Sequence, residues 1–98
     1  MGCYVEVENK EQWLKDNSSW NTMVKTPKWE EFGGDHLPVV LVDNGPFKAA
    51  GIAFDKQEYE RFTDPYDFRP KVIYSVALEE LKKVSDIENY LAKEEGNV

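Results

Sequence analysis

The chain has 98 residues, of which 41% are hydrophobic and 13% aromatic, enough apolar material for one packed domain over 1–98. Its net charge of −7 repels phosphate backbones and anionic lipid, so direct nucleic-acid binding and membrane-surface binding are disfavoured. The longest apolar run, Val39–Val42, is far shorter than the roughly 20 residues of a membrane span. A lone cysteine, Cys3, and the absence of a secretory signal pattern predict a soluble, cytoplasmic protein.

The amino-terminal residues predict a strand followed by a helix. Apolar and polar residues alternate over Cys3–Val7, which is typical of a half-buried strand. Asn9 followed by Gln12 forms a capping-box pair, which marks the start of a helix carrying Trp13 and Leu14.

The stretch 18–37 has no clear periodicity, and we interpret it as an irregular insert. It contains Trp20 and Trp29, two of the three tryptophans. Pro27 suits the first position of a helix, so a short helix that contains Trp29 and Phe32 is expected there.

The middle of the chain predicts a hairpin and a second helix. Val39–Val42 is β-branched and apolar almost throughout, which favours a central strand. The turn residues at 43–46 and the apolar residues over 47–54 predict a hairpin with a returning strand. Asp55 and Glu58 form a second capping pair, and a helix of about two turns is expected after them.

Prolines bracket an extended link over 64–71, and a strand over Val72–Val76 follows. Apolar residues at helical spacing predict a helix after this strand, and Ser85 with Glu88 suggests a fresh cap within it. We expect 94–98 to be a frayed tail.

These elements predict the α+β class, with a mainly antiparallel sheet of about four strands packed against helices. Their order is compatible with the ferredoxin-like β-α-β-β-α-β arrangement, interrupted by the insert at 18–37.

His36 is the sole histidine and could act as a general base oriented by Asp35, as in a small hydrolase. No serine or cysteine motif marks a nucleophile for it, so we favour a polar loop residue that precedes a strand. In the 64–71 link, Asp64 and Asp67 could hold Mg²⁺ or act as an acid and base pair, and Arg69 could bind an anion. A salt-bridged structural loop is the preferred interpretation.

No glycine-rich nucleotide motif or metal-ligand spacing is present, so we predict neither a cofactor nor a dedicated metal site. The aromatic residues are the better candidates for function, since tryptophan, tyrosine and arginine dominate the binding energy of interfaces. The alternative is that the insert folds over the sheet and buries its tryptophans. The predicted partner-binding residues are Trp20, Trp29, Phe32, Tyr66, Phe68 and Arg69.

The first functional hypothesis is therefore a non-enzymatic domain that binds another protein and inhibits or regulates it. In composition the chain resembles the short accessory proteins that bacteriophages and mobile elements encode. One alternative is a nucleic-acid mimic that places its acidic residues in a basic groove of a partner. Others are a small-ligand binder in a homo-oligomer and the small hydrolase built on His36.

Overall fold

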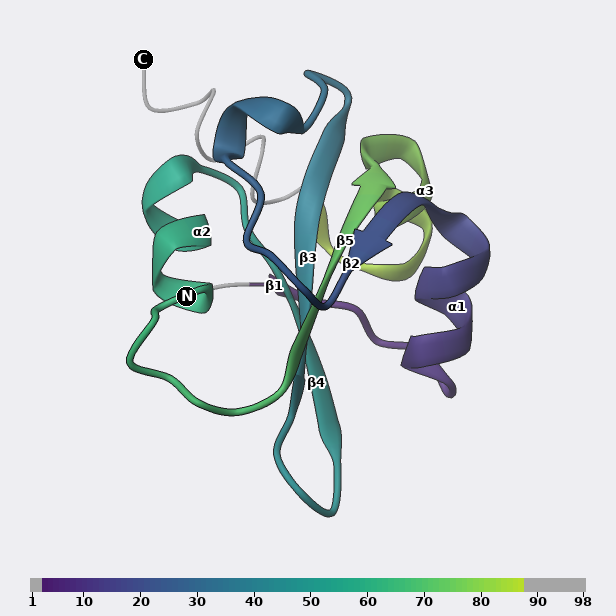
Figure 1. The fold of residues 1–98 in the computed structure, drawn as a ribbon. Helices are drawn as coiled ribbons and strands as arrows, with labels where there is room; N and C mark the ends of the chain where they lie inside the picture. The colour runs from purple at the N-terminus through teal and green to yellow at the C-terminus, as the bar shows by residue number, and fades with distance from the viewer. Residues whose placement is uncertain (1–2, 88–98) are drawn as a thin grey trace.

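The computed structural model describes residues 3–87, which form one antiparallel sheet with helices packed on it (Figure 1). In chain order the elements are β1 (Cys3–Tyr4), α1 (Lys10–Asn17), β2 (Ser18–Thr22), the 3-10 turn η1 (Trp29–Glu31), β3 (His36–Asp43), β4 (Lys48–Ile52), α2 (Lys56–Phe62), β5 (Lys71–Ala77) and α3 (Leu78–Val84).

The sheet over residues 3–87 has five strands in the order β1-β4-β3-β5-β2, and every neighbouring pair is antiparallel. The α+β class and the antiparallel sheet are thus confirmed. The ferredoxin-like order is not found, because that order places the first strand inside the sheet, whereas β1 lies at an edge. The opposite edge is β2, a strand within the stretch that we predicted to be irregular.

Helices cover both faces of the sheet, with α1 and α3 on one side and α2 and η1 on the other (Figure 1). Side chains of a strand alternate between the faces, so Val39 and Leu41 pack on one side while Val40 and Val42 pack on the other. A strand buried on both faces needs apolar residues at every position. This accounts for the unbroken apolar run at the centre of the chain.

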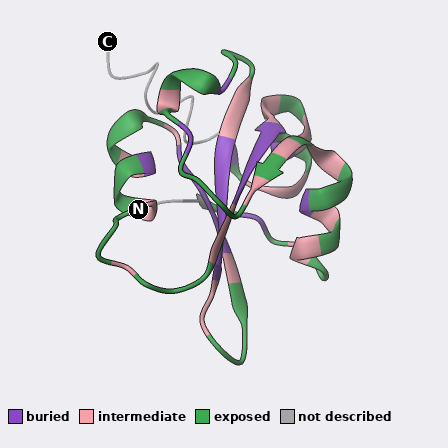
Figure 2. Cartoon of the chain, in the orientation of Figure 1, coloured by how far each residue is buried: buried purple, intermediate pink, exposed green. Residues whose placement is uncertain are grey.

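The two faces have different compositions. We call the side under α1 and α3 the aliphatic face; its buried residues are Val5, Leu14, Val39, Leu41, Ala50, Ile52, Tyr74, Val76, Leu81 and Ile87. We call the other side the aromatic face; it comprises buried Phe32, Val40, Val42, Ala53, Tyr59 and Ile73, with Trp20, Trp29 and Phe62 half-buried against them. Figure 2 shows that burial concentrates in the sheet between these layers.

Asn9 and Asp55 cap the helices α1 and α2, as predicted. Asn9 accepts a hydrogen bond from the Gln12 amide at 3.2 Å, although the Gln12 side chain bonds Asp16 instead of reaching back. Asp55 accepts from the Glu58 amide at 2.8 Å, which fixes the start of α2.

Several boundaries differ from the predictions. The first strand ends at Tyr4, although the Val5 amide still donates to Ala50 of β4 at 3.0 Å. The short helix of the insert is a single 3-10 turn with Lys28 as its N-cap, so Pro27 precedes it. The cap that pairs Ser85 with Glu88, the helix beyond it and the tail at 94–98 lie outside the described residues. No helix between residues 3 and 87 has the length and apolar character needed to cross a membrane.

Candidate functional site

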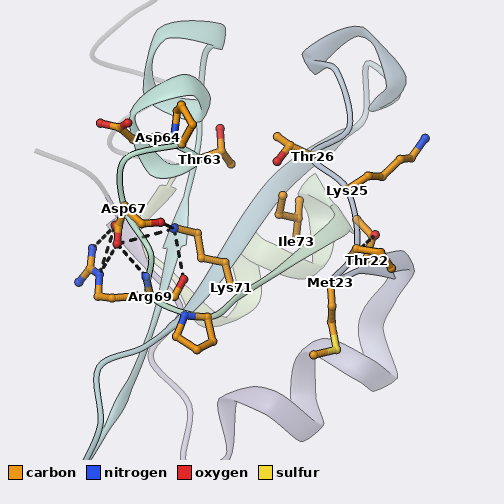
Figure 3. A pocket seen from close by; sticks show the side chains of 13 residues that line it. Thr22, Met23, Lys25, Thr26, Thr63, Asp64, Asp67, Arg69, Lys71 and Ile73 are labelled. Atoms are coloured by element: carbon orange, nitrogen blue, oxygen red, sulfur yellow. Dashed lines mark hydrogen bonds and ion pairs between the residues drawn. The ribbon is translucent and has the colours of Figure 1, made fainter.

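A groove of about 390 Å³ separates residues 22–26 of the insert from the proline-bracketed link (Figure 3). Ile73 of β5 lies between the two walls, with Thr26 on one side and Thr63 on the other. The lining residues are Thr22, Met23, Val24, Lys25, Thr26, Thr63, Asp64, Pro65, Asp67, Arg69, Pro70, Lys71 and Ile73. The fold therefore brings together the two segments that the sequence had singled out separately.

Four large apolar side chains stand in solvent on the two walls. Met23 and Val24 follow β2 and are 76% and 96% exposed, while Tyr66 and Phe68 of the link are 85% and 90% exposed. Tyr66 and Phe68 alternate along the link with residues that line the groove, and they are not themselves among the lining residues. We call these four side chains the apolar rims. Paired exposure of this kind marks an interaction surface more often than a scattered surface residue does.

The link that carries Tyr66 and Phe68 is held by its own polar groups. The Asp64 carboxylate accepts from the Tyr66 amide at 2.8 Å, and the Asp64 carbonyl accepts from the Asp67 amide at 3.0 Å. The Arg69 guanidinium donates to the Asp67 carboxylate at 2.6 and 2.9 Å and to the Asn44 side chain at 2.6 Å. The link is thus fastened both to itself and to the hairpin turn of β3 and β4.

The Asp67 carboxylate has a structural role. Hydrogen bonds from Arg69 hold its pKa far below the usual range, and the charge of Lys71 lowers the pKa further. A carboxyl that ionises so readily is a poor general acid at neutral pH. Among residues 3–87, no cluster of three or more histidine, cysteine, aspartate or glutamate side chains could hold a metal ion. The geometry agrees with the interpretation of this link as a salt-bridged connection.

The predicted aromatic contacts divide into two groups. Tyr66, Phe68 and Arg69 are exposed on the link. Phe32 is only 8% exposed and packs in the aromatic face, with ring centroids 4.9 Å from Trp20 and 5.3 Å from Tyr59. Phe32 is therefore a core residue and presents no contact surface to a partner.

Trp20 and Trp29 are half-buried, so the insert folds over the sheet without covering them fully. Trp29 also lines a second hollow of about 570 Å³ beside α2. This hollow shares Thr26 and Thr63 with the groove, so the two depressions adjoin. Trp29 thus remains close to the candidate binding surface.

A separate polar cluster lies near the other end of β2. The Ser19 hydroxyl is 2.8 Å from Nε2 of His36, and Nδ1 of the same ring is 2.9 Å from the Asp35 carboxylate. The sequence indicated His36 and Asp35, but Ser19 was missed because it lies 17 residues before His36 in a strand that was not predicted.

Comparisons of this chain with protein-family models, with curated proteins and with solved structures found no significant match.

Proposed function

We propose that this domain binds an extended segment of another protein along the groove between β2 and the proline-bracketed link. The segment would carry apolar side chains for the apolar rims and at least one carboxylate. Binding of this kind lets a small domain inhibit or regulate a partner without chemistry of its own. The observation that carries the proposal is the exposure of Met23, Val24, Tyr66 and Phe68 on two segments that face one groove.

The fixed conformation of the link supports this proposal. Exposed aromatic side chains contribute most to affinity when little conformational entropy is lost on binding. The Asp67–Arg69 ion pair and the turn at Asp64 hold the backbone that carries Tyr66 and Phe68 before any partner arrives. A link that served only to join α2 to β5 would not need to present two aromatic rings to solvent.

An extended conformation of the ligand follows from the sheet. Within residues 3–87, β2 is an edge strand that pairs with β5 on one side only, so its other edge can accept a further strand. The chain continues from β2 directly into Met23 and Val24 at the groove. A peptide paired with this edge would reach Met23 and Val24, the part of the apolar rims that continues from β2, with alternate side chains.

The charges around the groove favour an acidic ligand even though the whole chain has a net charge of −7. Lys25 on one wall and Arg69 on the other are exposed, and Lys71 lies between the walls. The groove carboxylates of Asp64 and Asp67 already accept hydrogen bonds from the link itself. Lys25 pairs with Glu31 at 3.8 Å and Arg69 pairs with Asp67. The lining nevertheless holds three cations against two carboxylates, and this surplus of positive charge favours a carboxylate of the partner.

A library of random linear peptides panned against the domain tests the proposal. We expect selected peptides to combine apolar and acidic residues, and Phe68→Ser or Met23→Ser to weaken their binding by about tenfold, or roughly 1.4 kcal/mol. Fluorescence anisotropy with synthetic peptides measures the dissociation constants. Methylation of alternate peptide amides should abolish binding if the peptide adds a strand to β2.

Phe47→Ser is the matched control, because Phe47 is an exposed aromatic residue on the hairpin turn, which is neither of the two segments that line the groove. Equal loss of binding in Phe47→Ser and Phe68→Ser would contradict a specific surface. Concentration-dependent dimerisation of the wild type that Phe68→Ser abolishes would assign the apolar rims to a second copy of the chain instead.

A further inference from the structure

We propose that Ser19 is a nucleophile activated by His36, with Asp35 as the positioning residue, and that this site hydrolyses carboxylic esters. Ser19, Asp35 and His36 lie outside the groove lining, although Ser19 belongs to the strand β2 that leads into the groove. The three side chains form one connected chain of hydrogen bonds, 2.8 Å from Ser19 to His36 and 2.9 Å from His36 to Asp35.

The direction of these hydrogen bonds suits nucleophilic catalysis. An ionised carboxylate only accepts hydrogen bonds, so Nδ1 of His36 carries the proton that is donated to Asp35. In the neutral ring, Nε2 is then the unprotonated nitrogen and accepts the hydrogen bond of the Ser19 hydroxyl. The hydrogen bond to His36 lowers the pKa of the Asp35 carboxyl, which keeps it ionised. This is the arrangement of roles in Ser-His-Asp hydrolases.

The backbone holds each member in place. The register between β2 and β5 shifts between Ser18 and Trp20, so Ser19 is the extra residue of a β-bulge. Bulges redirect side chains and are frequent beside active sites. His36 is the first residue of β3 and pairs with Ala77 of β5.

The turn before β3 leaves room for the Asp35–His36 hydrogen bond. The Asp35 carbonyl accepts from the Leu78 amide at 2.8 Å, and the His36 amide donates to the Gly33 carbonyl at 3.1 Å. A Cβ atom on Gly33 would lie 3.2 Å from Oδ1 of Asp35 and 3.6 Å from Nδ1 of His36. Glycine at this position therefore permits the close approach of the two side chains.

The reaction proceeds in two steps that use water as the only co-reactant. Oγ of Ser19 bonds to the carbonyl carbon of the ester while its proton moves to Nε2 of His36, and the alcohol leaves with that proton. Water then attacks the acyl carbon and gives a proton to Nε2. The bond from carbon to Oγ breaks, the carboxylic acid is released, and Oγ regains its proton from Nε2.

The exposure of the cluster limits both the rate and the substrate. The Asp35 side chain is 87% exposed, so water competes with His36 for the carboxylate, whereas the His36 side chain is only 25% exposed. A weakly oriented imidazole suits esters with a good leaving group, such as nitrophenyl esters. We therefore expect slow turnover of activated esters.

Labelling of the full chain with a fluorophosphonate, followed by peptide mass mapping, tests Ser19 directly. Ser19 is one of four serines, so the labelled position is easily identified. We expect a single adduct on Ser19, and a fall in labelling rate of about 100-fold in His36→Gln, the lower range for loss of a general base. Ser18→Ala is the matched control and should label like the wild type. Release of nitrophenolate is followed in a Cys3→Ser background to exclude acylation of the thiol.

The positioning role of Asp35 is tested by the tautomer of His36, which a purely structural role of Asp35 would not change. His36 is the only histidine, so nitrogen NMR of the untagged chain reports its tautomer without overlap. We expect Nδ1–H in the wild type and Nε2–H in Asp35→Asn, with labelling as slow as in His36→Gln, and recovery in Asp35→Glu.

Three results would overturn the proposal. These are adducts spread evenly over the serines, an unchanged labelling rate in correctly folded His36→Gln, and the Nε2–H tautomer in the wild type. None of these outcomes depends on peptide binding, and loss of peptide binding would leave the labelling of Ser19 unaffected.

Discussion

The two faces of the sheet differ in how completely they are closed. On the aliphatic face, Leu14, Ile52 and Leu81 have no exposed surface, and α1 and α3 cover the strands. On the aromatic face, Trp20 and Trp29 remain half-buried. The aliphatic face thus supplies stability, whereas the aromatic face combines packing with a surface that other molecules can reach.

The groove that we propose for peptide binding is continuous with the aromatic face. Ile73 belongs to the core of that face and also lines the groove. Tyr59 packs against Phe32 and lines the adjoining hollow. Changes in the aromatic face should therefore affect both folding and binding, while changes in the aliphatic face should affect folding alone.

Leu14→Ala should have the largest effect and tests whether the aliphatic face is closed. Leu14 is completely buried in α1, and removing such a side chain leaves a cavity that costs about 2–5 kcal/mol. Urea denaturation followed by tryptophan fluorescence measures the free energy of unfolding. Lys15→Ala on the exposed side of the same helix should change it by less than about 0.5 kcal/mol. A cost below about 1 kcal/mol for Leu14→Ala would show that this face tolerates a gap.

Gly51→Ala should have the next largest effect and tests how tightly the aromatic face is packed. A Cβ atom on Gly51 would lie 2.9 Å from the ring of Phe62, so the ring must move. Crowding of this kind costs about 1–3 kcal/mol.

Phe62→Leu in the same chain should restore part of the stability lost in Gly51→Ala, because the smaller side chain makes room. The double-mutant cycle measures this coupling. If the changes in the free energy of unfolding of the two single variants simply add in the double variant, Gly51 and the ring of Phe62 are not coupled.

Tyr59→Phe should have the smallest effect, about 1 kcal/mol, because it removes one hydrogen bond. The Tyr59 hydroxyl donates to the Pro27 carbonyl at 2.5 Å and so ties α2 to the insert. Burial raises the pKa of Tyr59 from 10.0 to about 12. The unfolded chain therefore releases this proton at lower pH than the folded chain.

The stability that comes from neutral Tyr59 is complete below about pH 10 and is lost as the pH rises toward 12. The free energy of unfolding, measured across this pH range, should decline more steeply for the wild type than for Tyr59→Phe. Tyr74, whose pKa burial also raises, lies on the aliphatic face and is unchanged in both proteins. If the free energy of unfolding fell equally steeply with pH in the wild type and in Tyr59→Phe, the pH dependence could not be assigned to Tyr59.

Local signals predicted the hairpin and the two capped helices. The apolar run Val39–Val42 and the turn after it correspond to β3 and the hairpin to β4, with Gly45 at a φ of 90°. Asn9 and Asp55 cap α1 and α2 because a helix start needs acceptors for its free amides, whatever the tertiary structure. Tyr66 and Phe68 could also be predicted as candidate binding residues from the sequence, because they lie in the link bracketed by prolines.

Long-range pairing could not be predicted in the same way. Apart from Trp20, the segment of β2 has short polar residues and no apolar alternation, and it becomes a strand because β5 offers it an edge. The proximity of the insert to the 64–71 link and of Ser19 to His36 depends on that pairing and on the bulge. The buried position of Phe32 likewise depends on how the insert folds over the sheet.

The place of β2 at the edge of the sheet also has a kinetic consequence. The hairpin of β3 and β4 closes a short loop, whereas β2 pairs with a strand more than fifty residues further along the chain. Closing so long a loop is entropically costly, which favours late formation of this pairing during folding. An edge strand is also the easiest to release in local opening. Peptide binding and ester hydrolysis by Ser19 would thus both depend on β2, the strand expected to form last in folding and to open most readily.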